Sequence, residues 1–213
     1  MHDDVNQKLK LQLAKSRDLI DAKTLPYVLA TGKSELLVRD LFASQIDRSL
    51  CFGPDSFVAR EWRAHDLTIF DDDIPIIIIE GKAWIHADIV SGQKLTSTRD
   101  SIKNNMYIDI EKINQTRRDF PGIHGYLSTL LVSCDSTKRQ FDAYSPIKYE
   151  YKHRASIRRI GSLDAVVEQG NERFHGFIQT EFGATDITQF DFVHGSYRGL
   201  EVRATIFLFK FSL

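Results

Sequence analysis

Apolar and polar residues follow a helical period at the start of the chain. The first 20 or so residues place leucines at spacings that suggest a helix, and "TGKSELLVRDLFASQID" (31–47) repeats the pattern more regularly. Ser34 is expected to cap this second helix. Its buried stripe is expected to contain four residues, which are Leu36, Leu37, Leu41 and Ile46.

The pattern then changes to the two-residue period of β-strands. A Gly-Pro turn in "CFGPDS" (51–56) ends the helical region. "FVAREW" (57–62) and "HDLTIF" (65–70) alternate, and "DDDIP" (71–75) has the composition of a turn. "IIIIEGKAWI" (76–85) is apolar on both faces at its start, which predicts a central strand.

The rest of the chain mixes both periods. The triplet "SGQ" (91–93) separates the strand region from a predicted long helix over 96–120, whose stripe contains Ile102, Met106, Ile110 and Ile113. Further elements are predicted as a buried strand over 125–133, a helix over 156–169 and a strand over 200–211, with no ordered element assigned to 174–199. The order α, β, β, β, α, β, α, β predicts an α/β fold with a central mixed β-sheet flanked by helices.

Length, charge and cysteine content narrow the classes of protein. With 213 residues we expect one domain over 1–213. A net charge of -1 argues against a generally basic protein that coats nucleic acid, although a basic cleft is compatible with it. Cys51 and Cys134 lie far apart, no secretory leader is visible and no apolar run reaches about 18 residues. We therefore expect reduced thiols, a cytoplasmic location and no membrane association.

Charged residues stand at the end of the most apolar strand. Side chains alternate along a strand, so Glu80 and Lys82 point to one face and Gly81 to the other. If the two strands around "DDDIP" are antiparallel neighbours, Asp66 lies close to this strand end. Two carboxylates with a lysine suit a hard divalent cation such as Mg²⁺, which prefers oxygen ligands. The plainer interpretation is an ion pair between Glu80 and Lys82 at the edge of solvent.

Asp66 followed by Glu80-Gly81-Lys82 at the end of an apolar strand resembles the PD-(D/E)xK nuclease superfamily, over residues 33–132. Glu35, in the helix before the sheet, resembles the helix-borne glutamate of many members. The chain departs from the pattern in two places: His65 precedes Asp66 where the pattern has proline, and glycine occupies the middle of the ExK triplet.

This resemblance implies a restriction-endonuclease-like fold, with a core of about 33–132 and additions over 133–213. It implies Mg²⁺-dependent hydrolysis of DNA phosphodiester bonds, with Mn²⁺ as an alternative ion, in prokaryotic restriction or defence. Asp66, Glu80 and the carbonyl of Gly81 would bind the metal. Lys82 would position the attacking water, and Glu35 would complete a second metal site or hold a metal-bound water.

The resemblance also implies partners. One chain brings one site, so cutting both strands of a duplex suggests a homodimer or a larger assembly. A different class of function is a binding module that keeps the fold without turnover, and a third is an enzyme acting on RNA or another phosphate ester.

Several residues have competing interpretations. Asp73 is the rival of Asp66, although its place in a turn favours a solvated role. Glu35 also suits the dipole at the start of a helix. The remaining candidates near the strand end are His65, His86, Gln93 and Lys94.

A basic cluster in "KYEYKHRASIRR" (148–159) is the candidate nucleic-acid contact. It interleaves Tyr149 and Tyr151 with five basic residues, which are Lys148, Lys152, Arg154, Arg158 and Arg159. The competing interpretation is a solvated helix face, which Glu150 in its middle favours. Arg117 and Arg118 end the long helix, where the helix dipole alone favours them.

Overall fold

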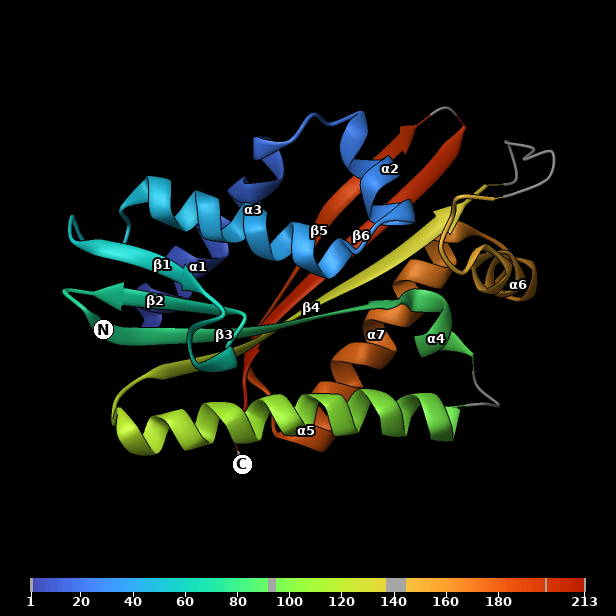
Figure 1. The fold of residues 1–213 in the computed structure, drawn as a ribbon. Coiled ribbons are helices and arrows are strands. Elements are labelled where there is room, and N and C mark those ends of the chain that lie inside the picture. The colour runs from blue at the N-terminus through green and yellow to red at the C-terminus, as the bar shows by residue number, and fades with distance from the viewer. Residues whose placement is uncertain (1, 92–94, 137–144, 198, 213) are drawn as a thin grey trace.

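The computed structural model describes residues 2–91, 95–136, 145–197 and 199–212. Its described residues form a six-stranded mixed sheet in the order β1-β2-β3-β4-β6-β5 (Figure 1). The helices are α1 (His2–Ser16), α2 (Thr24–Thr31), α3 (Ser34–Ser49), α4 (His86–Val90), α5 (Leu95–Asp119), α6 (Glu150–Ile160) and α7 (Leu163–Phe182). The strands are β1 (Ser56–Arg60), β2 (Leu67–Asp71), β3 (Ile74–Ile85), β4 (His124–Asp135), β5 (Thr185–Tyr197) and β6 (Leu200–Lys210). The predicted α/β class, with a central mixed sheet flanked by helices, is confirmed.

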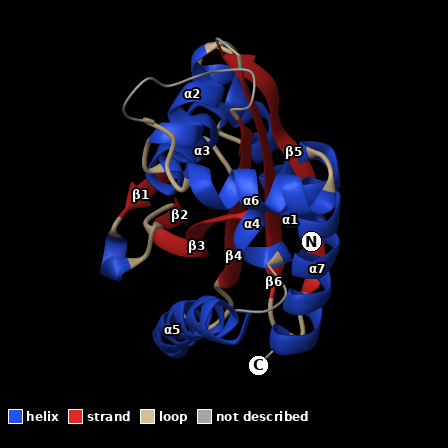
Figure 2. Cartoon of the chain, turned by 90° about the vertical axis from the view of Figure 1, so that its right-hand side faces the viewer, coloured by secondary structure: helices blue, strands red, loops and turns tan. Residues whose placement is uncertain are grey.

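Strands β3 and β4 form the parallel pair at the centre of the sheet, and the other neighbouring strands are antiparallel. A parallel pair needs a long crossover, which α4 and α5 provide. The carboxyl ends of β3 and β4 therefore lie at the same end of the sheet. In Figure 2 these ends face the viewer, with α4 and α6 in front of them.

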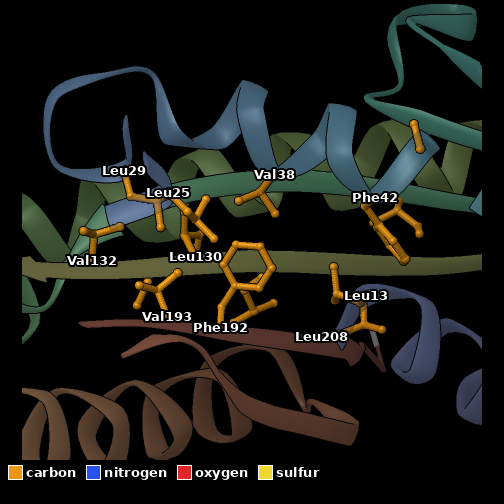
Figure 3. Packing of buried hydrophobic residues seen from close by; sticks show 14 of the residues in the cluster. Leu13, Leu25, Leu29, Val38, Phe42, Leu130, Val132, Phe192, Val193 and Leu208 are labelled. Carbon is orange, nitrogen blue, oxygen red and sulfur yellow. The ribbon is translucent and has the colours of Figure 1, made fainter. Parts of the chain in front are cut away.

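The sheet separates two apolar cores. On one face α1, α2 and α3 pack on the sheet, with Leu13, Leu29 and Phe42 among the buried side chains (Figure 3). On the other face the core includes the predicted α5 stripe of Ile102, Met106, Ile110 and Ile113, packed with α7. Because both faces are covered, the central strands are apolar on both sides, which is why "PIIII" reads as a continuous apolar run.

Several predictions about individual elements are wrong. Ser34 is the first residue of α3 and Lys33 is the capping residue, without a side-chain hydrogen bond. Leu36 is exposed, whereas Val38 and Phe42 are buried, so the buried stripe of α3 is rotated from the one expected. Leu37 and Leu41 are only partly buried.

The helix expected over 156–169 is two helices. Gly161 ends α6 with φ of 115°, and Ser162 begins α7 by accepting a hydrogen bond from the Ala165 amide. Helix α7 then continues through Gly170, and the end of α7 together with β5 fills most of the region left unassigned. Helix α2 was also missed, because Pro26 reads as a helix breaker but is tolerated in the first turn. The predicted break at 91–93 lies partly outside the described residues.

None of the described helices combines the length and apolar character that a membrane span requires.

Two glycines of α7 give a matched test of its packing. A methyl group at Gly170 would lie 2.7 Å from Cδ2 of His86, whose side chain is fully buried and cannot move aside. At Gly176 a methyl group would meet no atom within 4 Å. We expect Gly170→Ala to lower the free energy of unfolding by about 1–3 kcal/mol, and Gly176→Ala to raise it by up to about 1 kcal/mol. Urea denaturation measures both, and a shift in the same direction for the two variants would contradict the packing described.

Two buried histidines predict how stability depends on pH. Burial lowers the pKa of His86 and of His153 to about 4, although hydrogen bonds partly oppose the shift. Because the pKa is lower in the folded state, the neutral imidazole stabilises the fold at pH values above the unfolded pKa of about 6.5. This stabilisation is lost as the pH falls towards 4. We expect the free energy of unfolding to fall by about 2 kcal/mol per histidine between pH 7 and 5. Denaturation of His153→Gln should give a flatter pH dependence, with exposed His194→Gln as the control.

Candidate functional site

The site forms where β2 stops short of β3. The last residue pair between these strands joins Leu67 to Ile79, so β3 from Glu80 onwards has no β2 residue beside it. On its other side β3 stays paired with β4 as far as Ile85. This end of β3 is therefore open at one edge only.

Asp66 replaces the missing strand partner at this edge. Its Oδ2 accepts a hydrogen bond of 2.7 Å from the Gly81 amide. The amide and carbonyl of a strand residue point to the same side, so the Gly81 carbonyl faces the same open edge. The expected closeness of Asp66 and Gly81 is thus present.

A strained turn delivers Asp66 to this position. The chain between β1 and β2 passes through Glu61, Arg63 and Ala64, each with positive φ, in and beside the short 3₁₀ turn η2 (Trp62–Ala64). Residues other than glycine adopt this backbone conformation at a cost in free energy, and residues strained in this way cluster at functional sites. Arg39 of α3 forms an ion pair with Glu61 and lies 3.8 Å from Oδ1 of Asp66, which ties the turn to α3.

Glu80 is almost fully buried, at 1% exposure, and is held by partners of its own. Its Oε1 lies 2.5 Å from Nδ1 of His65, whose Nε2 is 2.8 Å from the Thr116 hydroxyl. A carboxylate only accepts, so Nδ1 of His65 carries the proton and donates to Glu80. Lys112 of α5 lies 2.9 Å from the same Oε1. His65 thus has a structural partner, and Glu80 is anchored to α5.

A chain of alternating charges connects Glu80 to Lys82 through two residues of α5, Lys112 and Asp109. Lys112 also approaches Asp109 Oδ1 at 3.6 Å, and Asp109 Oδ2 lies 2.6 Å from the Lys82 ammonium. Glu80 and Lys82 therefore share the α5 face of β3, as the alternation predicts, but they are joined through Lys112 and Asp109.

A small pocket lies between α3 and the open edge of β3. Glu35, Asp66, Gly81 and Lys82 line it, together with Arg39 and apolar side chains, and its volume is about 30 Å³. This is enough for a water or a small ion. Glu80 does not line it. Three of the four predicted catalytic residues thus meet at one pocket, while Glu80 lies in the adjoining charge network.

Glu35 and Lys82 have shifted pKa values for opposite reasons. Desolvation raises the pKa of Glu35, and the negative charges of Asp66 and Asp109 raise it further, although Lys82 opposes them. For Lys82, burial favours the neutral amine, but its hydrogen bond to Asp109 and the nearby carboxylates outweigh burial and raise its pKa. Lys82 is therefore a stable cation at neutral pH.

A larger cleft of about 470 Å³ continues from Glu35, which borders both spaces. It lies at the carboxyl ends of β3 and β4, where Trp84 and Cys134 line it. The starts of α3 and α6 also border it, and neither helix has a side-chain cap. Uncapped amides at helix starts favour anions. Its basic residues are Lys33, Lys148 and Lys152.

The predicted basic cluster divides in the structure. Lys148 and Lys152 line the cleft, and Arg158 is exposed outside it. Arg154 pairs with Glu150 at 2.7 Å, and Arg159 donates to the Val90 carbonyl at 2.7 Å. The two arginines thus have structural partners, and the cluster is neither a uniform binding face nor simply solvated.

The other candidates lie apart from the pocket. Asp73, with φ of 62°, sits in the exposed β2–β3 turn, at the opposite end of β2 from Asp66. His86 is buried and lies 3.0 Å from the Asn171 side chain. Arg117 stacks on the Phe211 ring, and Gln93 and Lys94 lie outside the described residues.

Four residues escaped the sequence reasoning or were given little weight by it: Arg39, His65, Asp109 and Lys112. The α5 residues had a detectable signal. Asp109, Lys112 and Thr116 recur at helical spacing beside the apolar stripe, and polar residues on such a face usually have partners. Arg39 and His65 gave no comparable signal, because their roles depend on contacts between distant segments.

Among the described residues, no three histidine, cysteine or acidic side chains gather closely enough to hold a metal ion by themselves. Compared with known proteins, the chain matches no family model, no curated protein and no solved structure.

The raised pKa of Glu35 predicts that its ionised form destabilises the fold at neutral pH. A carboxyl group whose pKa is higher in the folded state stabilises the fold below its unfolded pKa, and this contribution is lost as the pH rises. We therefore expect Glu35→Gln to melt at a higher temperature than the wild type at pH 7, with the difference shrinking near pH 4. Thermal unfolding at both pH values measures this, and a Gln variant less stable at pH 7 would contradict the desolvation described.

Proposed function

We propose that this protein is a Mg²⁺-dependent endonuclease that hydrolyses DNA phosphodiester bonds. The observation that carries the proposal is the meeting of Glu35, Asp66, Gly81 and Lys82 at one pocket that adjoins a lysine-lined cleft. A nuclease needs oxygen ligands for a metal, a fixed cation and a groove for phosphates. The resemblance to the PD-(D/E)xK superfamily supports the same activity.

The donor set of the pocket fits Mg²⁺. Asp66, Glu35 and the Gly81 carbonyl offer oxygen atoms, and Mg²⁺ is usually bound by one or two carboxylates completed by water and phosphate. Burial and, to a smaller extent, the negative charge of Asp66 raise the pKa of Glu35, and a bound cation would favour its ionised form. The bound ion would lower the pKa of a water and neutralise charge on the phosphate.

Glu80 takes a conditional place in this proposal. Its Oε1 is engaged by His65 and Lys112, so this oxygen can enter a metal shell only if at least one of them releases it. We assign the resting Glu80 the task of holding Lys112, and through Asp109 the position of Lys82. Lys82, as a stable cation, is suited to stabilising charge on the phosphate or orienting a water, and unsuited to removing a proton.

We place this activity in the cytoplasm of a prokaryote, in restriction or defence. Cys51 and Cys134 are both free, which agrees with a reducing compartment. A catalytically inactive binding module on the same fold is the second candidate. The meeting of Glu35, Asp66 and Lys82 at the pocket favours the enzyme, because binding alone requires neither the lysine nor a pair of carboxylates.

A plasmid-cleavage assay with Mg²⁺ or Mn²⁺ tests the proposal. We expect Asp66→Asn and Lys82→Ala to reduce the cleavage rate by about 100-fold or more, the scale on which removing one electrostatic group acts. Asp73→Asn is the matched control, because Asp73 lies at the other end of β2, and it should cleave like the wild type.

Metal binding gives a readout that does not depend on cleavage. Calorimetric titration with Mn²⁺ should show weaker binding by Asp66→Asn and Glu35→Gln, and a smaller effect for Glu80→Gln. An effect of Glu80→Gln equal to that of Asp66→Asn would make Glu80 a ligand, as the sequence alone suggests. Metal-independent DNA binding without cleavage would favour the binding module. Cleavage of RNA but not of DNA would favour an enzyme that acts on RNA.

A further inference from the structure

Tyr149 has a backbone conformation that its side chain does not favour. It precedes α6 with φ of 59° and ψ of 30°, in the left-handed region, and its side chain makes no capping hydrogen bond. Glycine or asparagine is the usual residue there. Tyr149 nevertheless lines the cleft and is 45% exposed. Strain of this kind together with an exposed aromatic ring points to a role for the ring itself.

Positive charges surround this ring. The ammonium groups of Lys148 and Lys152 lie 5.3 and 5.1 Å from its centroid. Lys152 is held by Asp88 at 2.7 Å, whereas among the described residues neither Lys33 nor Lys148 forms an ion pair. Proteins that bind single strands combine an aromatic ring with a basic groove, because bases stack on the ring and lysines contact phosphates. Tyr149 supplies the ring, and Lys33 and Lys148 are the cleft lysines without an ion pair among the described residues.

The size of the cleft favours an unpaired nucleotide over a base-paired duplex. Its volume of about 470 Å³ lies in the range of small-ligand sites. The faces of bases within a duplex are covered by their neighbours, so a base must leave the stack before it can contact a protein ring. The cleft therefore suits one unpaired nucleotide.

We infer that the cleft binds one unpaired nucleotide of the DNA strand that is cut, with its base stacked on Tyr149. Its phosphate lies near Lys33 and Lys148, where the uncapped starts of α3 and α6 also favour an anion. Glu35 borders both the cleft and the pocket, so the same strand continues to Asp66 and Lys82. The substrate is thus single-stranded DNA or a frayed end. The statement that this strand is the one cut rests on the proposed nuclease function, whereas the stacking of a base on Tyr149 does not.

Binding without cleavage tests the inference. Fluorescence anisotropy in EDTA compares a labelled oligothymidine of about 12 nucleotides, within the usual site sizes, with a blunt DNA hairpin of similar length. We expect the wild-type chain to bind the single strand at least tenfold more tightly than the hairpin. Tyr149→Ala should weaken single-strand binding by about 5- to 100-fold, as loss of one stacked base does, and Tyr149→Phe should retain it.

Two variants separate stacking from folding. Tyr149→Gly removes the ring and relieves the left-handed strain, so it should be folded and lose the same affinity as Tyr149→Ala. Tyr151→Ala is the matched control, because Tyr151 lies two residues further along, in the first turn of α6, is 70% exposed and does not line the cleft. It should bind like the wild type.

The outcomes separate this inference from the proposed function. Three results would overturn the inference, even if plasmid cleavage is observed. They are absence of single-strand binding, tighter binding of the hairpin, and an equal loss of single-strand affinity in the Tyr149→Ala and Tyr151→Ala variants. Tyr149-dependent binding without cleavage of any polymer would support the stacking and overturn the nuclease.

Discussion

The burial of one carboxylate governs the architecture around the candidate site. Glu80 sits in a strand covered on both faces, and an unpaired charge there would cost several kcal/mol. Its compensation comes from two directions, from His65 before β2 and from Lys112 on α5. These contacts fix the distance between β3 and α5, which in turn places Asp109 against Lys82. The charged end of an apolar strand is therefore satisfied through a network that spans three elements.

The site also depends on the different lengths of neighbouring strands. Because β2 begins only at Leu67, the Asp66 side chain accepts the hydrogen bond from the Gly81 amide, and a pocket opens where β2 would otherwise extend. The cleft beyond it lies at the carboxyl ends of the parallel pair, the position where open α/β sheets usually bind ligands. If that cleft holds a single strand, one site is sufficient for one cut, and the expectation of a homodimer loses its main reason.

The sequence predicted the elements with strong periodicity and missed those governed by local exceptions. The apolar run of β3 and the α5 stripe identified the centre of the fold correctly, because both depend on burial alone. Gly161 divides two helices, Gly170 does not interrupt one, and Pro26 lies within a first turn; composition does not distinguish these cases. The closeness of Asp66 to the strand end that carries Lys82 followed from strand pairing and order, whereas the place of Glu35 followed only from the family resemblance. The engagement of Glu80 by His65 and Lys112 could not be foreseen, since it depends on how α5 crosses the sheet.

The connectivity of the sheet gives the site an order of assembly. Strands β1, β2 and β3 are joined by short connections, so the contact between Asp66 and Gly81 closes only a short loop. The parallel pairing of β3 with β4 must wait until the long crossover through α5 is in place, which is entropically slower. Asp109 and Lys112 arrive with that crossover. The half of the site that contains Asp66 and Gly81 can thus form early in folding, whereas the half in which Asp109 holds Lys82 is completed only with the native central sheet.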